Sequence, residues 1–220
     1  IRVTEVARAI TDFPVVISRL PNGDMSLSAL TGFEPGQNLF VDGDVWDSSF
    51  QSAAMQTYPL YLMRDGQGGP DPVLGVDDSS PALVRDEGQA LLDKKGRPSL
   101  WVRQIKAQLL NDSQNMMLTL QFVDMLESKN LIRDVDIILN YEDQQTNRIR
   151  GLSMIHEDNL KALPSAHFEQ LRQSGFLAPI QAMLFSVFQL NSLIRRYNHV
   201  NAARKIKTIN LEITKDIGSV

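Results

Sequence analysis

Apolar and polar positions alternate in short segments over the first hundred residues. Residues 13–20 and 25–33 are rich in β-branched or alternating apolar side chains. Asn22-Gly23 lies between them and suits a tight hairpin turn, because asparagine and glycine tolerate positive φ. The same features predict further strands at 38–41, 45–46, 58–63 and 72–76, with an Asp42-Gly43-Asp44 turn after the first of these.

The spacing of apolar residues changes to three or four after Ser99. It continues with one interruption to Leu126, as one face of a long helix requires. Ser99 can cap this helix by accepting hydrogen bonds from free backbone amides of the first turn. The polar residues 111–115 leave open a kink or two shorter helices. Alternation returns at 135–141 and 148–155, which predicts a second hairpin.

The segment 176–197 is apolar on almost every side until its last turn. A helix that is apolar all round is usually buried. Its unbroken apolar part is shorter than the roughly 20 residues needed to cross a bilayer, and Gln181 and Gln189 interrupt it. We therefore expect a buried core helix and no membrane insertion. The polar, partly basic residues 201–220 predict a loose tail.

Together these patterns predict an α+β fold. Mostly antiparallel β-sheets would pack on a long amphipathic helix and a buried C-terminal helix. We expect a β-rich first half at 1–98, an α+β second half at 99–200 packed with it as one domain, and a polar tail at 201–220. A chain of 220 residues is long enough for such a domain, since it buries roughly 70% of its unfolded surface.

Charge and cysteine content exclude several classes of function. The net charge of −4 argues against nucleic-acid binding, which needs a concentrated basic surface. The absence of cysteine removes disulfides, thiol nucleophiles and thiolate metal sites. No signal-peptide-like segment opens the sequence, so we expect a cytoplasmic protein. Because the chain begins at Ile1, a preceding targeting segment stays open.

Acidic and histidine residues at two strand ends are weak candidates for catalysis. Asp77 and Asp78 lie at one strand exit, where carboxylates can bind metal or activate water. His156 and Glu157 lie at another and could act as general acid–base groups. An Asx turn explains the first pair more simply, and turn or cap chemistry explains the second.

Three further residues have the ligand types of a two-histidine, one-carboxylate iron site: His167, Glu169 and His199. His167 and Glu169 would diverge by about 200° on one helix, because successive helical residues are about 100° apart. They should not meet at one metal. We therefore predict no metal site and no cofactor.

Two groups of residues are the candidates for binding. Amide and aromatic side chains of the sort that line ligand sites occur at Asn38, Trp46 and Tyr58, although packing of the sheet would explain them equally well. The dense basic cluster that could contact an acidic partner or a phosphate includes Arg195, Arg196 and Arg204. Its first two members could instead oppose the negative end of a helix dipole.

Six segments spread over nearly the whole chain carry a family resemblance. They are GQNLF at 36–40 followed by Trp46, YPL at 58–60, LGVDDSS at 74–80, EGQALLDKKG at 87–96, Gly151-Leu152 leading to Glu157 and the leucines at 160 and 163, and SGFLAPIQAMLFSVFQLNSLIR at 174–195. In this order they resemble the bacterial SapC-like family, which is named after a surface-layer-associated gene.

The resemblance brings no established catalytic residues. Gene neighbours of its members include outer-membrane receptors, flavin-dependent halogenase-like proteins and cupin-type oxygenases, which implies a helper of peptide- or metabolite-modifying enzymes linked to outer-membrane uptake. We expect a non-catalytic ligand- or protein-binding module with a protein or small-molecule partner, and leave a homodimer open. The alternatives are a metal-dependent, oxygenase-like enzyme with an acidic and histidine site, and a surface-layer-associated structural protein.

Overall fold

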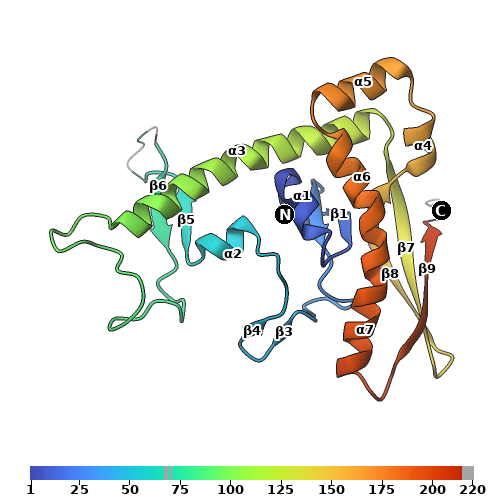
Figure 1. Ribbon diagram of the computed structural model, residues 1–220, viewed down its shortest axis with the longest axis horizontal. Helices are drawn as coiled ribbons and strands as arrows, with labels where there is room; N and C mark the ends of the chain where they lie inside the picture. Colours follow the sequence, from blue (N-terminus) through green and yellow to red (C-terminus); the bar gives the residue numbers. More distant parts are fainter. Residues whose placement is uncertain (67–68, 70, 215–220) are drawn as a thin grey trace. The chain divides into compact units, whose positions relative to one another are not determined.

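The computed structural model describes residues 1–66, 69 and 71–214. The chain forms two compact units. The larger unit contains residues 1–50 together with the chain from Leu118 onward, and the smaller unit contains Gln51–Met117. Helix α3 (Leu100–Ser128) begins in the smaller unit and ends in the larger one (Figure 1). In this division the first 50 residues belong to the same unit as the chain from Leu118 onward.

A five-stranded antiparallel sheet organises the larger unit. Its strand order is β2-β1-β8-β7-β9, so the N-terminal hairpin pairs with a strand from the second half of the chain. Both predicted hairpins are confirmed. The strands are β1 (Val15–Arg19), β2 (Met25–Ala29), β7 (Ile132–Tyr141), β8 (Thr146–Ile155) and β9 (Ile206–Ile213).

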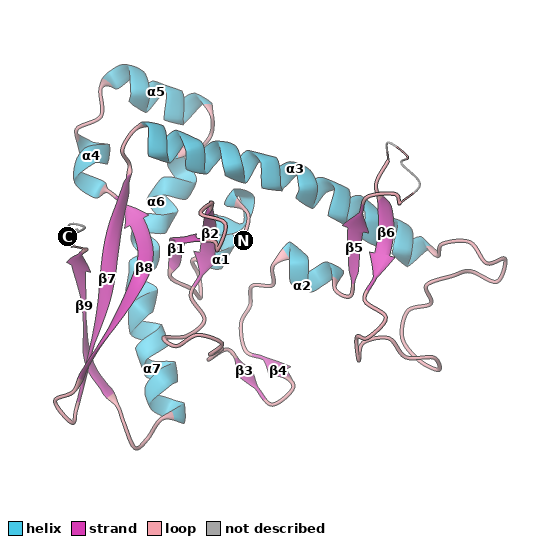
Figure 2. Cartoon of the chain, turned by 180° about the vertical axis from the view of Figure 1, so that it is seen from behind, coloured by secondary structure: helices cyan, strands magenta, loops and turns pink. Residues whose placement is uncertain are grey.

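Helices cover one face of this sheet. The inward side chains of β1 and β7, such as Ile17, Ile137 and Leu139, are fully buried. Helix α6 packs on β1 and β8, and α7 packs on β9. Besides the end of α3, the helices are η1 (Val3–Glu5), α1 (Val6–Ala9), α4 (Glu157–Lys161), α5 (Ser165–Gln173), α6 (Leu177–Ser186), η2 (Val187–Gln189) and α7 (Leu190–Val200). Helices and antiparallel sheets together confirm the α+β class (Figure 2).

The other face of the sheet carries polar side chains that form ion pairs, beside the buried Val16 and Ile138. Arg148 on β8 contacts Asp136 on β7 at 2.7 Å and Glu212 on β9 at 2.9 Å. Thr214 donates a further hydrogen bond to Asp136 at 2.8 Å. Donation from Arg148 lowers the pKa of Asp136 despite the opposing effect of burial. These bonds fasten the edge strand β9 to the rest of the sheet.

The apolar C-terminal segment, expected as one buried core helix, forms α6, η2 and α7 and is buried on the side that faces the sheet. Successive turns place Ile180, Met183, Leu190 and Leu193 in the core. Phe185 and Phe188 lie outward and are 63% and 68% exposed. The physical reason is that a single sheet face offers the helix a partner on one side. By length and composition alone, the segment Leu177–Val200 could also span a membrane.

The expected loose tail is corrected for residues 206–213. They form β9, which pairs with β7 over most of its length. The pairing includes an irregularity between Asn140 and Tyr141, which leaves Lys207 without an opposite residue. Residues 215–220 of the expected tail lie outside the described part of the chain.

The smaller unit contains a two-stranded sheet beside the first half of α3. Ser99 caps this helix by accepting from Val102 N–H at 3.2 Å, as predicted, and α3 is one helix through residues 111–115. Few large apolar side chains are buried here; Leu60, Val102 and Ile105 are the buried ones among the unit's described residues. Its other elements are α2 (Ala53–Thr57), β5 (Leu60–Met63) and β6 (Val73–Val76).

Candidate functional site

A short hairpin and its flanking residues, 37–50, form what we call the groove loop of the larger unit. Its strands are β3 (Val41–Asp42) and β4 (Val45–Trp46), joined by the predicted Asp-Gly turn. The expected strand at 38–41 is shorter than predicted. The side chain of Asn38 folds back to accept from Phe40 N–H at 3.0 Å, so extended pairing starts only at Val41.

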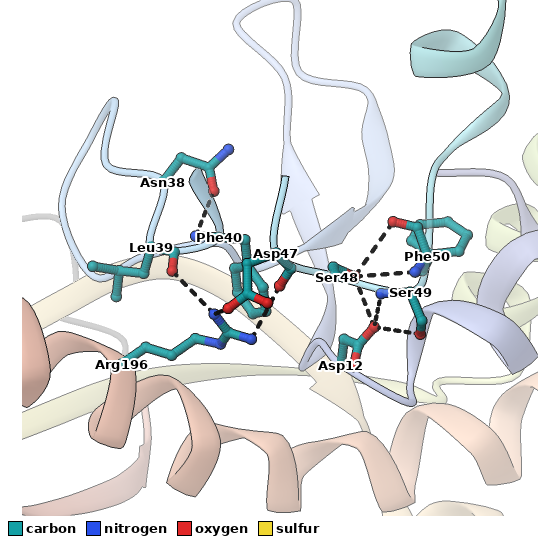
Figure 3. A network of polar contacts seen from close by, with 9 residues as sticks. All are labelled: Asp12, Asn38, Leu39, Phe40, Asp47, Ser48, Ser49, Phe50 and Arg196. Carbon is teal, nitrogen blue, oxygen red and sulfur yellow. Dashed lines mark hydrogen bonds and ion pairs between the residues drawn. The ribbon is translucent and has the colours of Figure 1, made fainter. Parts of the chain in front are cut away.

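Arg196 on α7 fixes one end of the groove loop. Its guanidinium donates to Asp47 Oδ2 at 2.6 Å and to the Asp47 backbone oxygen at 3.0 Å. It also lies 4.1 Å above the ring of Phe40 and reaches the backbone oxygen of Leu39 at 3.4 Å (Figure 3). One side chain therefore holds three residues of the groove loop against α7.

An aromatic cluster holds the middle of the groove loop. Trp46 packs on Phe13 and Phe40, with ring centroids 6.1 Å apart in each case. Its indole N–H donates to the backbone oxygen of Phe50 at 2.9 Å. The ring and the polar atom of Trp46 are thus both engaged within the fold, which favours the packing explanation for this residue.

Asp12 holds the end of the groove loop. Its carboxylate accepts from Ser48 Oγ at 2.7 Å, from Ser49 Oγ at 2.9 Å and from Ser49 N–H at 3.1 Å (Figure 3). Partial burial raises the pKa of Asp12, but these hydrogen bonds outweigh that effect and hold the pKa below its usual value. The groove loop is therefore tied down at Asp12, at Trp46 and at Arg196.

A groove of about 960 Å³ lies between the groove loop and α7. Asn38 lines it from the loop side, and its amide nitrogen points away from the hydrogen bond that its oxygen makes (Figure 3). Arg195 and His199 line it from α7, and both side chains are exposed. Arg195 donates to Ser192 Oγ at 3.0 Å, which occupies one of its terminal nitrogens. The groove thus presents several hydrogen-bond donors to solvent.

The groove brings together predicted residues from both binding groups. Asn38 came from the ligand-binding group, whereas Arg195 and Arg196 came from the partner-binding group, and all three line the groove. Arg204 does not line it. Its guanidinium stacks 4.0 Å from the Tyr141 ring and forms an ion pair with Asp143 at 3.5 Å.

Tyr58, the third predicted ligand-binding residue, belongs to the smaller unit. It is 54% exposed and lines an open hollow of about 480 Å³ in that unit, together with Pro59 and Trp101. This hollow belongs to the smaller unit, whereas the groove belongs to the larger unit.

The candidate acid–base residues of the larger unit have local structural partners. His156 caps α4, because its Nδ1 accepts from Asn159 N–H at 3.3 Å. Arg133 also reaches this nitrogen at 3.1 Å. Glu157 pairs with Lys161 one turn later at 2.7 Å. These contacts match the turn and cap explanation.

The acidic candidates of the smaller unit form the expected turn. Asp77 Oδ1 accepts from Ser79 N–H at 3.1 Å and from Ser79 Oγ at 2.6 Å, which is an Asx turn. Asp78 is exposed beside it. Among the residues described, no three His, Asp or Glu side chains gather closely enough to hold a metal ion. Glu169 instead pairs with Arg172 at 2.6 Å, and this contact lowers the pKa of Glu169.

Sequence reasoning missed Ser192, Asp47 and the groove role of His199. The sequence does carry a signal for Ser192 and His199. Their spacings of three and four from Arg195 place all three residues on one face of α7. Nothing local signals Asp47, because its partner Arg196 lies 149 residues away in the sequence.

Fold and groove together define an α+β protein in which a fixed loop faces the last turns of a helix. The chain belongs to the SapC family, whose sequence model matches residues 1–193. The match includes the groove loop and Ser192, while Arg195, His199 and β9 follow it. No curated protein and no solved structure matches the chain.

Proposed function

We propose that this protein is a non-catalytic binding module and that its groove takes a short acidic segment of a protein partner. The observation that carries the proposal is that two neighbouring arginines make different contacts. The guanidinium of Arg196 is bonded to the groove loop. The guanidinium of Arg195 lies exposed in the groove and donates a hydrogen bond to Ser192. Arg196 therefore holds the groove loop in place, whereas the charge of Arg195 is accessible to a ligand.

A carboxylate is the group that suits Arg195 best. The guanidinium is planar and always charged, and it binds carboxylates through two parallel hydrogen bonds. Asn38 and His199 add further donors along the same groove. The charge of Asp47 is already offset by Arg196, which leaves Asp42 as the other acidic residue lining the groove.

The groove also offers apolar contact. Val41 and Val200 line it and are 47% and 64% exposed. A ligand with an apolar side chain and a carboxylate could contact the two valines with the first and Arg195 with the second. A peptide segment carries such groups at short spacing, which is why we favour a protein partner over a small polar molecule.

The contacts of the candidate catalytic side chains support a binding role over an enzymatic one. His156, Glu157 and Asp77 are each engaged in a cap, an ion pair or a turn close to their own position in the chain. A binding role also agrees with the helper function that the family resemblance implies beside modifying enzymes. The metal-dependent alternative has no ligand cluster among the described residues.

Affinity capture from the native cell with three baits tests the proposal. The baits are the wild-type chain, Arg195→Glu and Arg19→Glu; the last makes the same charge change on exposed Arg19 of β1, which does not line the groove. We expect at least one partner that wild type and Arg19→Glu retain and Arg195→Glu loses. Identical sets of bound proteins on all three baits would contradict the groove assignment.

A further inference from the structure

Strand β9 pairs with β7 on one side, and on its other side no strand of the described residues lies beside it. The sheet order ends at β9, which appears as the outermost strand of the larger unit (Figure 1). An unpaired strand edge presents a row of backbone N–H and C=O groups that another chain can pair with. The hydrogen bonds that β9 already makes show which residues point their backbone groups outward.

Thr214 donates its backbone N–H to Asp134 O at 3.1 Å, so its backbone groups point toward β7. In an antiparallel pair such residues alternate with those whose groups point away. Ile213, Leu211 and Ile209 therefore present their N–H and C=O groups outward. At the start of β9 the outward groups of Ile206 are already used, because both bond to the Asn198 side chain at 2.8 Å.

The side chains of the same three residues leave apolar surface at this edge. Leu211 and Ile213 are 41% and 61% exposed, although Ile137 and Val135, opposite them on β7, are buried. The apolar side chains on this face of the sheet thus continue from β7, where they are buried, to β9, where they are exposed. A further strand with apolar side chains on this face would cover it.

We propose that β9 pairs antiparallel with β9 of a second copy of this chain, about a two-fold axis at Leu211. This register places Leu211 opposite itself, Ile209 opposite Ile213, Asn210 opposite Glu212 and Thr208 opposite Thr214. Apolar residues face apolar residues on one side of the sheet, and polar residues face polar residues on the other. Among residues 208–214 no like charges face each other, and the outward groups of Ile209, Leu211 and Ile213 all gain partners.

Neighbouring registers fit less well, which is why we assign this one. A two-fold axis at Asn210 would place Lys207 opposite Ile213. An axis at Ile209 would bring the pairing to Ile206, whose backbone groups Asn198 already holds. Residues 208–214 are therefore complementary to themselves around Leu211, and this complementarity points to a second copy as the occupant.

Single cysteines test the register directly, because the natural chain has none. Opposite residues in an antiparallel pair lie about 4.5–5.5 Å apart at Cα, within the range of a disulfide. Leu211→Cys should form a disulfide-linked dimer at least about tenfold faster than Val45→Cys, since pairing raises the effective thiol concentration. Val45 is the control because it is exposed and lies in the groove loop. Equal rates for the two variants would overturn the proposal.

A second variant tests the interface without oxidation. Leu211→Lys places two positive charges opposite each other on the two-fold axis. The wild-type chain should show a concentration-dependent rise in mass by light scattering, and Leu211→Lys should stay monomeric at the same concentrations with an unchanged circular dichroism spectrum. A wild-type chain that stays monomeric at the highest concentration reached, or a variant that dimerises as well as wild type, would refute the pairing.

Discussion

Arg196 on α7 and Asp47 in the groove loop form an ion pair at 2.6 Å across 149 residues of sequence. Because the same guanidinium also covers the ring of Phe40, a single substitution should loosen this wall of the groove. Arg195, the next residue, makes no comparable contact with the loop. The two arginines therefore give a matched pair of variants for separating structure from binding.

Arg196→Ala should lower the free energy of unfolding by about 1–2 kcal/mol, from a partly exposed ion pair and a cation–π contact. Arg195→Ala should change it by less than about 0.5 kcal/mol, as exposed substitutions usually do. Urea denaturation followed by circular dichroism measures both. Equal losses for the two variants would mean that Arg196 does not hold the loop.

The one-sided burial of the C-terminal helix predicts opposite effects on its two faces. Leu193→Ala removes a side chain that is 1% exposed and should cost about 2–5 kcal/mol. Phe188→Ala removes one that is 68% exposed and should cost less than about 0.5 kcal/mol. Thermal or urea denaturation of the two variants measures both losses of stability. A large loss at Phe188 would show that the outer face is covered.

The contact of Asp136 with Arg148 predicts a specific pH dependence of stability. The pKa of Asp136 is lowered in the folded protein, so this carboxylate stabilises the fold above its unfolded pKa of about 3.9. That contribution is lost as the pH falls through the folded pKa. Asp136→Asn should therefore be less stable than wild type at neutral pH, and the difference should shrink below about pH 4. A difference that stays constant from pH 7 to pH 3 would contradict this origin.

The capping role of His156 can be separated from catalysis by two substitutions. His156→Ala should cost about 1 kcal/mol, because α4 loses the acceptor for Asn159 N–H. His156→Asn should recover most of that stability, since asparagine is among the best N-cap residues. A result in which both variants destabilise the protein equally would point to another role for the ring.

Local patterns predicted the hairpins and the long helix well. Asn22-Gly23 carries its turn preference in two adjacent residues, and Ser99 carries its cap preference in one. The buried face of the C-terminal helix could not be predicted this way, because Phe185 and Ile180 are equally apolar and only the sheet distinguishes them. The groove could not be predicted either, since no spacing rule connects Asp47 with Arg196.

Strand β9 is a different case, because its signal was present in the sequence. Ile209, Leu211 and Ile213 alternate with Asn210 and Glu212, as in a strand with one apolar face. The polar and basic composition of the surrounding residues obscured that alternation. Edge strands often carry such polar residues, so polarity alone is weak evidence for a loose tail.

The most direct test of the binding role places a photo-crosslinker in the groove inside the native cell. Benzoylphenylalanine at Val200 lies in the groove, and the same probe at Leu20, which is exposed and lies outside the groove, serves as the control. The mass of any adduct would distinguish a protein partner from a small molecule. A second Val200 probe carrying Arg195→Glu tests the role of the charge.

We predict an adduct from Val200 that Leu20 does not give and that Arg195→Glu abolishes. Absence of any adduct at Val200, or an adduct that persists unchanged with Arg195→Glu, would contradict the assignment of this groove as the binding site.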